Sequence, residues 1–212
     1  MAETTSFNDI KRQFKENKRL RLITIGATAL IVVILGYILY RQFVYAPNNQ
    51  KANEGYYRGL NLAAKDSVDA AIAELEPFVK KNDGYQGGEV AEFTLARQYM
   101  AKGDFQKALK LLEGVKLKDT YGPALALGLQ GDCYSELGKY KEAIDYYMDA
   151  ADANENEWTT PTYLFKAGQV AEEIKDYAKA KELYERINQD YYMFGQQKTI
   201  DKYIARVSNN IQ

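Results

Sequence analysis

The chain has 212 residues, of which 46% are hydrophobic and 27% are charged, proportions typical of a folded protein and unlike those of a disordered one. It contains only 4 Pro, and its content of Ala, Leu, Lys, Glu and Tyr favours helices over strands. We therefore predict an all-α protein.

The composition also excludes several kinds of active site. There is no His, which is the side chain most used for acid–base catalysis near neutral pH and a common metal ligand. Cys133 is the only cysteine, so a disulfide within one chain and a cysteine-based zinc site are excluded. Because no basic residue adjoins it, we expect Cys133 to be a buried structural thiol. The sequence predicts no catalytic, cofactor-binding or metal-binding residue.

The N-terminal region predicts a membrane anchor. Residues 22–40 carry no charge, and at about 1.5 Å rise per residue they cross roughly 30 Å of hydrocarbon. Thr24 and Thr28 are the clearly polar interruptions, and both are small enough to bond to their own backbone. A cleaved signal peptide needs a shorter apolar core, and Pro47 disfavours cleavage at the nearest small-residue site. We predict an uncleaved signal-anchor helix at 22–44 that lies in the lipid bilayer.

The flanking charges predict the orientation of this span. Six cations precede it and two follow it: Lys11, Arg12, Lys15, Lys18, Arg19 and Arg21, then Arg41 and Lys51. By the positive-inside rule, 1–21 is a basic cytoplasmic tail, 45–51 a linker and 52–212 an extracytoplasmic domain.

Charge is divided unequally between the two parts of the chain. Residues 1–51 hold 8 Lys and Arg against 3 Asp and Glu, which leaves 20 against 26 for residues 52–212, so the net charges are +5 and −6. An acidic domain without concentrated Lys and Arg is unsuited to phosphate backbones. We therefore exclude nucleic acid as a partner.

A repeated pattern fills the C-terminal part. Four sets of residues have identical offsets, in the order small residue, apolar residue, alanine, large apolar residue, apolar residue. The sets are Gly59, Val68, Ala71, Leu75, Phe78; Ala96, Phe105, Ala108, Leu112, Val115; Gly131, Tyr140, Ala143, Tyr147, Ala150; and Gly168, Tyr177, Ala180, Tyr184, Ile187. Successive alanines are 37, 35 and 37 residues apart, so one structural unit recurs.

These residues resemble the tetratricopeptide repeat (TPR) family, most closely from Gly131 to Ala150. The resemblance implies a TPR-type α-solenoid of about four helix hairpins, in which the small residue of each first helix lets the second helix approach. Gly103 and Gly138 mark the ends of two first helices, whereas Lys175 stands at the corresponding turn without a glycine.

Three further segments complete the predicted domain. Residues 84–88 and 154–160 have the composition of loops between repeats, and we expect Trp158 to tuck under the fourth repeat. Apolar residues at helical spacing in 195–210 predict a C-terminal capping helix.

The resemblance to TPR proteins implies a peptide groove lined by the first helices. The inward positions mapped from the family pattern are Tyr56, Leu60, Phe93, Arg97, Met100, Asp132, Glu136, Phe165, Gln169 and Glu173. They are apolar toward the N-terminal side and acidic toward the C-terminal side, which suits a peptide with hydrophobic and basic residues. The alternative is that several pack between repeats. The Lys, Asn and Arg with which one TPR subclass holds a C-terminal carboxylate are absent.

The whole plan resembles the YfgM-like family of single-span proteins associated with the bacterial Sec translocon. This resemblance implies an ancillary translocon subunit in the inner (cytoplasmic) membrane, with a cytoplasmic N-terminus and a periplasmic C-terminal domain. The implied partners are proteins: translocon subunits, a membrane-anchored chaperone or prolyl isomerase, and exported polypeptides. It implies no small-molecule substrate.

Other functions are compatible with the same sequence. A scaffold or adaptor of another cell-envelope assembly complex would have the same architecture, and an organelle-surface TPR receptor would place the domain in the cytosol. Carboxylates such as Glu172, Glu173, Asp149 and Asp152 suggest acid–base catalysis, but we expect them on solvated helix faces. The sequence therefore favours an interaction protein over an enzyme.

Overall fold

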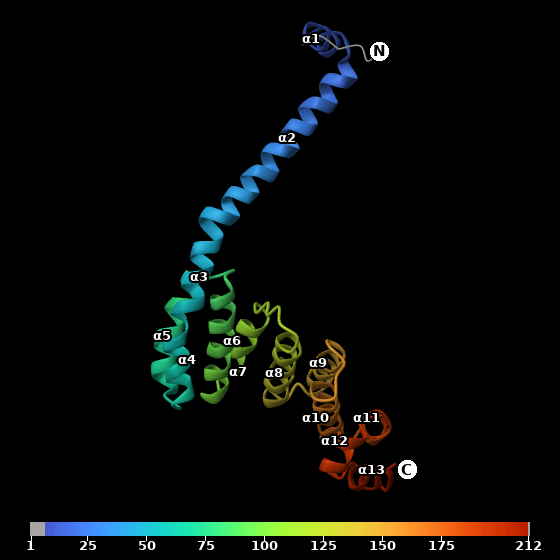
Figure 1. Cartoon of the computed structure of the whole chain (residues 1–212). Helices are drawn as coiled ribbons and strands as arrows, with labels where there is room; N and C mark the ends of the chain where they lie inside the picture. Colours follow the sequence, from blue (N-terminus) through green and yellow to red (C-terminus); the bar gives the residue numbers. More distant parts are fainter. Residues whose placement is uncertain (1–6, 212) are drawn as a thin grey trace. The chain divides into compact units, whose positions relative to one another are not determined.

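The computed structural model describes residues 7–211, and every regular element within them is a helix (Figure 1). The chain divides into two compact units, Met1–Lys51 and Ala52–Gln212. The first unit contains α1 (Phe7–Glu16), α2 (Lys18–Tyr40), the π-helical turn η1 (Arg41–Tyr45) and the start of α3 (Ala46–Gly55). The second contains α4 (Tyr57–Ala64), α5 (Val68–Lys81), α6 (Gln86–Ala101), α7 (Phe105–Leu112), α8 (Gly122–Glu136), α9 (Tyr140–Asp152), α10 (Thr159–Glu173), α11 (Tyr177–Asp190), α12 (Tyr192–Lys198) and α13 (Ile200–Ser208).

The helical stretch that starts with α2 is the one part of the described chain long and apolar enough to cross a membrane. Asn17 caps its start, because the side-chain oxygen accepts the backbone N–H groups of Arg19 and Leu20 at 3.0 and 3.1 Å. The Thr24 and Thr28 hydroxyls donate to backbone carbonyls one turn earlier, as the sequence predicted. No side chain of α2 is buried, which distinguishes it from the core helix of a soluble domain.

The segment predicted as a linker is helical. Residues 45–51 continue from the π-helical turn η1 into α3, with Pro47 in the first turn of α3, where a proline is tolerated. Neither Pro47 nor the asparagines that follow it interrupt the helix.

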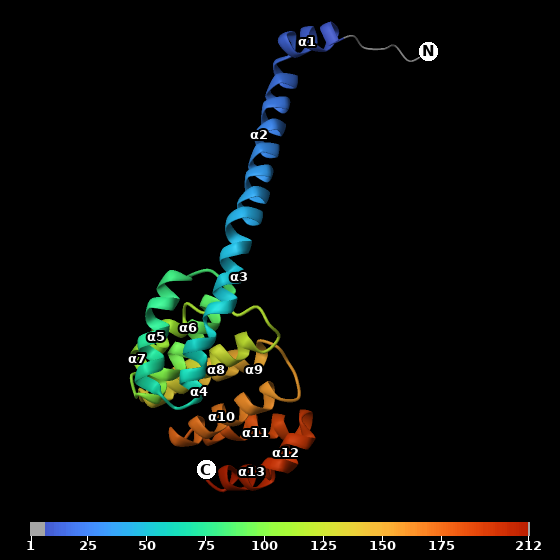
Figure 2. The same cartoon turned by 60° about the vertical axis from the view of Figure 1, so that its left-hand side comes forward.

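The second unit is a series of four helix hairpins, formed by α4 with α5, α6 with α7, α8 with α9, and α10 with α11 (Figure 2). Each second helix begins at the apolar residue that the repeat pattern marks, namely Val68, Phe105, Tyr140 and Tyr177. Helix α5 packs on α6, α7 on α8 and α9 on α10, so consecutive hairpins stack in chain order. The predicted all-α repeat fold is confirmed.

Every first helix ends in the same left-handed turn. Gly103 and Gly138 have φ of +79° and +72°, and Lys175 and Asp66 adopt φ of +63° and +53° at the matching positions. At the last of these turns, the backbone N–H of Lys175 donates to the carbonyl of Glu172 at 2.9 Å. Such turns form hydrogen bonds to the last backbone carbonyls of the helix, which have no partner within it. Two of the four turns therefore hold a side chain where glycine is unstrained.

The small residues of the first helices make room for large residues of the second helices. A Cβ added at Gly131 would lie 2.6 Å from the ring of Tyr147, and one at Gly168 would lie 2.5 Å from the ring of Tyr184. Ala71, Ala108, Ala143 and Ala180, the alanines of the pattern, are all fully buried. Close approach of the paired helices is therefore confirmed, and the glycines face the ring or large aliphatic residue four positions after the alanine.

Two loop expectations were wrong. The predicted loop 84–88 is partly helical, since α6 begins at Gln86 and both Gly87 and Gly88 are buried. A Cβ at Gly87 would lie 2.1 Å from the carbonyl oxygen of Ala52, so this glycine serves a close approach of two backbones. Trp158 does not tuck under the fourth repeat: it precedes α10, is 57% exposed, and contacts the ring of Tyr121 edge-on.

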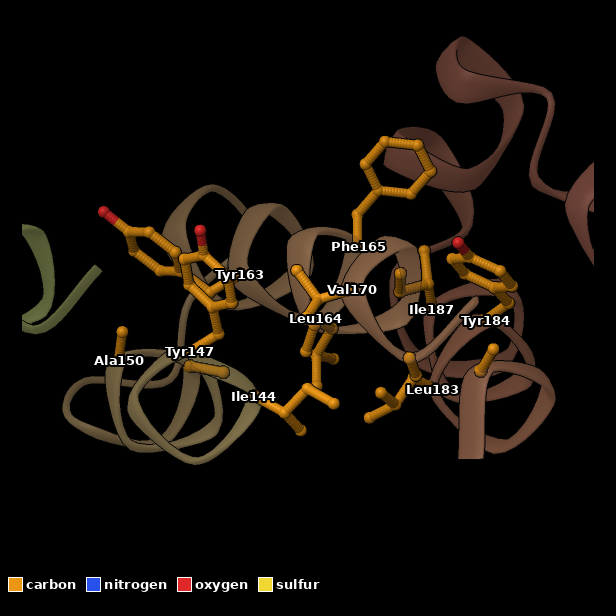
Figure 3. Close-up of a cluster of buried hydrophobic side chains, with 14 of the residues drawn as sticks. Ile144, Tyr147, Ala150, Tyr163, Leu164, Phe165, Val170, Leu183, Tyr184 and Ile187 are labelled. Carbon is orange, nitrogen blue, oxygen red and sulfur yellow. The ribbon is translucent and has the colours of Figure 1, made fainter. Parts of the chain in front are cut away.

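The C-terminal cap consists of two short helices, α12 and α13, joined at Thr199 in a left-handed conformation. Helix α13 packs on α11, and its Ile200 and Val207 are buried in the C-terminal core. That core also contains Tyr147, Leu164 and Tyr184, and Figure 3 shows how the side chains of α9, α10 and α11 meet there. The cap therefore closes the apolar end of the last hairpin, as predicted, but the chain breaks at Thr199 instead of forming the single helix expected over 195–210.

Candidate functional site

The ten predicted groove residues differ in how far they reach solvent. Four are exposed: Arg97, Glu136, Gln169 and Glu173. Five are half-buried and one is buried: Tyr56, Leu60, Phe93, Met100 and Asp132, then Phe165. Three of these pack against the N-terminal core: Tyr56, Phe93 and Met100. Part of the set therefore holds the repeats together, which was the alternative that the sequence left open.

Two of the ten residues line a pocket of about 770 Å³ between α10 and α12. Phe165 and Gln169 form its wall together with eight residues that the sequence did not single out for the groove: Glu157, Trp158, Thr162, Lys166, Met193, Phe194, Gln197 and Lys198. Figure 3 shows why Phe165 reaches the pocket, since its ring points away from Ile144 and Leu183, which lie on the core side of α10.

The apolar part of the pocket is built from rings that support one another. Phe165 contacts Phe194 and Tyr203 edge-on, with ring centroids 6.4 and 4.9 Å apart. Phe165 is only 9% exposed, whereas Trp158 and Met193 are 57% and 69% exposed. The floor is therefore held rigidly, while the rim presents large apolar side chains to water.

Two lysines border the pocket, and they differ in whether a carboxylate pairs with them. Lys166 donates to both carboxylate oxygens of Asp132, at 2.7 and 2.9 Å. Lys198 instead lies over aromatic rings, with its Nζ 5.7 Å from the centroid of Phe165 and 5.8 Å from that of Phe194. Within the described part of the chain Lys198 has no carboxylate partner, so its charge is available to a ligand.

Two side chains engage the carboxylate of Asp132. Besides Lys166, the hydroxyl of Tyr147 donates to its Oδ1 at 2.5 Å. Burial, with the nearby Asp132 charge as a second cause, raises the pKa of Tyr163 to about 12, so that hydroxyl stays protonated at neutral pH. Asp132 thus offers less to a basic peptide than its position in the sequence suggested, because its charge is used between repeats.

The same combination of groups recurs at the last junction. Glu172 accepts the hydroxyl of Tyr184 at 2.7 Å and both Nε and Nη2 of Arg206 at 2.9 and 2.7 Å. Glu172 is therefore engaged in packing α13 against α10 and α11, and it does not form an acid–base pair with the exposed Glu173.

The surroundings of Cys133 make it a poor nucleophile. Cys133 is fully buried, and this burial raises the pKa of its thiol to about 11, so the nucleophilic thiolate is scarce at neutral pH. In residues 7–211 no group of three or more His, Cys, Asp or Glu side chains is placed to hold a metal ion. The geometry of the site is suited to binding.

Sequence reasoning missed the contribution of α12 to this site. The repeat pattern ends with α11, and Met193, Phe194 and Lys198 fall in the segment between the last repeat and the cap. The available signal was the run of four large apolar residues at 191–194, of which Tyr192 and Met193 are exposed. Exposed apolar side chains that the core does not bury, such as Tyr192 and Met193, indicate a surface that binds a partner.

Comparison with known proteins identifies the repeats. A family model described as "Tetratricopeptide repeat-like domain" matches residues 11–118 and 60–172, and one described as "Tetratricopeptide repeat" matches residues 162–191. No curated protein matches the chain significantly.

Several solved structures have a similar fold. A crystal structure of MamA is 22% identical with a TM-score of 0.53, and covers 72% of this chain and 93% of its own. A second structure of MamA has 20% identity, a TM-score of 0.56, and coverage of 76% and 90%. The TPR-like repeats of a Podosopora anserina kinesin light chain have 15% identity, a TM-score of 0.55, and coverage of 76% and 95%. At these identities the likeness concerns the fold alone.

Proposed function

The chain belongs to the tetratricopeptide repeat-like family, and we propose that it is a membrane-anchored interaction protein whose first helices bind polypeptide at the surface of a bacterial inner membrane. In this proposal 22–44 is the anchor, 1–21 a cytoplasmic tail and 52–212 a periplasmic domain. TPR domains are protein-interaction scaffolds. The observation that carries the proposal is the aromatic pocket on the exposed face of α10, in a domain that follows a long apolar helix.

The finer part of the proposal concerns the partner. The plan of the chain resembles the YfgM-like family, so we propose an ancillary subunit of the Sec translocon that meets exported chains or a membrane-anchored periplasmic chaperone or prolyl isomerase. The exposed apolar rim of the pocket, with Trp158 and Met193, suits a protein ligand. The proposed contact surface consists of the exposed inward positions Arg97, Glu136, Gln169 and Glu173 together with the pocket.

Site-specific photocrosslinking in intact membranes tests this proposal. A photoreactive residue at Arg97 or Gln169 replaces an exposed side chain, whereas Phe93 and Phe165 are too buried to be replaced without disturbing the core. We expect both positions to crosslink to translocon subunits, a periplasmic chaperone or exported chains. Lys141, exposed on the second helix α9, is the matched control and should give no such product.

The alternatives predict different results in the same experiment. Crosslinks to another envelope complex would identify the chain as a scaffold of that complex and contradict the translocon role. Crosslinks from Lys141 but from neither groove position would show that the binding surface is elsewhere. Protease treatment of sealed inner-membrane vesicles tests the orientation, because digestion of 52–212 from the cytoplasmic side would contradict the periplasmic assignment.

A further inference from the structure

The pocket between α10 and α12 has features that specify a ligand more narrowly than a general interaction surface does. Its residues come from one face of α10, where Thr162, Phe165, Lys166 and Gln169 follow one another at helical spacing, and from the short helix α12. Since α12 lies outside the repeats, this pocket has no counterpart that the repeat pattern would place on α4, α6 or α8.

The first feature is apolar surface that the fold leaves open. Trp158 and Met193 are more than half exposed and stand at the rim, above the buried ring of Phe165. Large exposed apolar side chains that border a concavity are typical anchors for a binding partner. The concavity of about 770 Å³ is large enough for one or two bulky side chains and the backbone that carries them.

The second feature is the distribution of charge along the pocket. Lys198 stands over Phe165 and Phe194 without a carboxylate partner in the described chain, while Lys166 is neutralised by Asp132. The one acidic lining residue, Glu157, stands two positions before the first residue of α10, whereas Phe165 lies in the second turn of that helix. The apolar floor therefore has beside it a cation that forms no ion pair within the described chain.

The third feature is a pair of side-chain amides. Gln169 and Gln197 are both exposed and line the pocket from α10 and α12. Each amide has donors and an acceptor, which suits the alternating N–H and C=O groups of an extended backbone. A lipid tail cannot form hydrogen bonds with such a pair.

We propose that this pocket binds an internal, extended polypeptide segment in which a large apolar residue is followed by Asp or Glu. The apolar side chain packs on Phe165, Phe194 and Met193, and the carboxylate pairs with Lys198. The amides of Gln169 and Gln197 contact the backbone of the segment. The inference rests on the proposed function, since it names the kind of polypeptide that the proposed binding surface selects.

The single tryptophan of the chain makes the test specific, because Trp158 borders the pocket and its fluorescence reports occupancy there. The probe is a synthetic peptide with a Leu-Phe-Asp core and blocked ends, titrated into the detergent-solubilised full chain. We expect a saturable shift of Trp158 emission. A peptide with a Leu-Phe-Lys core should bind with an affinity about three- to tenfold lower.

Two pairs of variants distinguish an effect on the pocket from a general effect on folding. Lys198→Glu should weaken the Asp peptide about three- to tenfold and reverse the preference toward the Lys peptide, a reversal that misfolding cannot produce. Lys202→Glu, at an exposed lysine of α13 outside the pocket, should leave affinity within twofold. Met193→Ala should weaken binding about threefold or more, and Tyr192→Ala, at an exposed neighbour that does not line the pocket, should not.

Several outcomes would overturn the proposal. One is equal affinity for the Asp and Lys peptides, and another is binding only of a peptide whose Leu-Phe ends in a free carboxylate. A shift of Trp158 emission with mixed micelles containing phosphatidylglycerol, but not with peptides, would assign the face to lipid. Self-association that blocks the signal would assign it to a second copy. Crosslinking from Arg97, outside the pocket, tests the proposed function separately, so either can fail while the other stands.

Discussion

The junction between the last repeat and the cap gives the sharpest test of how this domain is stabilised. Glu172 accepts hydrogen bonds from the hydroxyl of Tyr184 and from two nitrogens of Arg206, at 2.7 to 2.9 Å. The side chain of Glu172 is 16% exposed and Tyr184 is fully buried, whereas the side chain of Arg206 is 55% exposed. The change Glu172→Ala should therefore affect its two partners differently.

Most of the stability lost in Glu172→Ala should come from Tyr184. Removing the carboxylate leaves the buried hydroxyl of Tyr184 without its acceptor, which costs about 1–3 kcal/mol. Arg206 regains water when its partner is lost, so the ion pair itself adds at most about 1 kcal/mol. Together the loss is about 1–4 kcal/mol in the free energy of unfolding. An ordinary surface substitution changes it by no more than about 0.5 kcal/mol.

Urea unfolding of the detergent-solubilised full chain, followed by far-ultraviolet circular dichroism, measures this loss. Glu173→Ala is the matched control, because Glu173 is the next residue of α10 and is exposed. Adding Tyr184→Phe to Glu172→Ala removes the unpaired hydroxyl, so the double variant should cost less than the sum of the two single variants. If Glu172→Ala and Glu173→Ala lower stability equally, the assignment of this junction is refuted.

Three further predictions concern single positions. Lys175→Gly should raise the free energy of unfolding by about 0.5–1 kcal/mol, because it relieves a left-handed backbone at φ +63°, and Gly138→Ala should lower it by about 1 kcal/mol in the same urea assay. Burial raises the pKa of Glu92 from 4.5 to about 7, so the folded chain binds a proton more tightly than the unfolded chain does. The free energy of unfolding should therefore fall as the pH rises from 4.5 to about 7. Glu92→Gln should abolish this pH dependence and be more stable than the unchanged protein at pH 8. Cys133 should resist alkylation by iodoacetamide until the chain is unfolded in urea, and fast labelling of the native protein would contradict its burial.

The helix hairpins could be predicted because their signals are local and recur. The turn at Gly138 followed by Tyr140, and its variant at Lys175 followed by Tyr177, place the start of each second helix at the residue found in the structure. Gly87 could not be interpreted in this way. Its lack of a side chain permits contact with the backbone of Ala52, which is 35 positions earlier in the sequence, and composition alone cannot distinguish this use of glycine from a loop.

The candidate site was predictable only where it depends on the repeats. Phe165 and Gln169 were mapped from the pattern of the TPR family, and both line the pocket. Asp132 was expected to attract a basic ligand, but its partner Lys166 belongs to the next repeat, and a side-chain pairing 34 residues apart is not visible in a helical pattern. Lys198 comes from a segment that the repeat pattern does not cover.

The packing of the cap explains how α12 comes to contribute Lys198 to the pocket. Asp132 pairs with Lys166, and Glu172 pairs with Arg206; both pairs span 34 residues and connect one layer of helices to the next. Helix α13 packs on α11 as α10 packs on α9, and so it occupies the place of a first helix in a further repeat. Helix α12 is then an insertion between the fourth repeat and this terminal helix. The regular repeats supply the stable stack, and the inserted helix supplies the wall and the available lysine that turn one face of that stack into a pocket. Ligand preference in related arrays should therefore follow the inter-repeat insertions more closely than the repeat residues themselves.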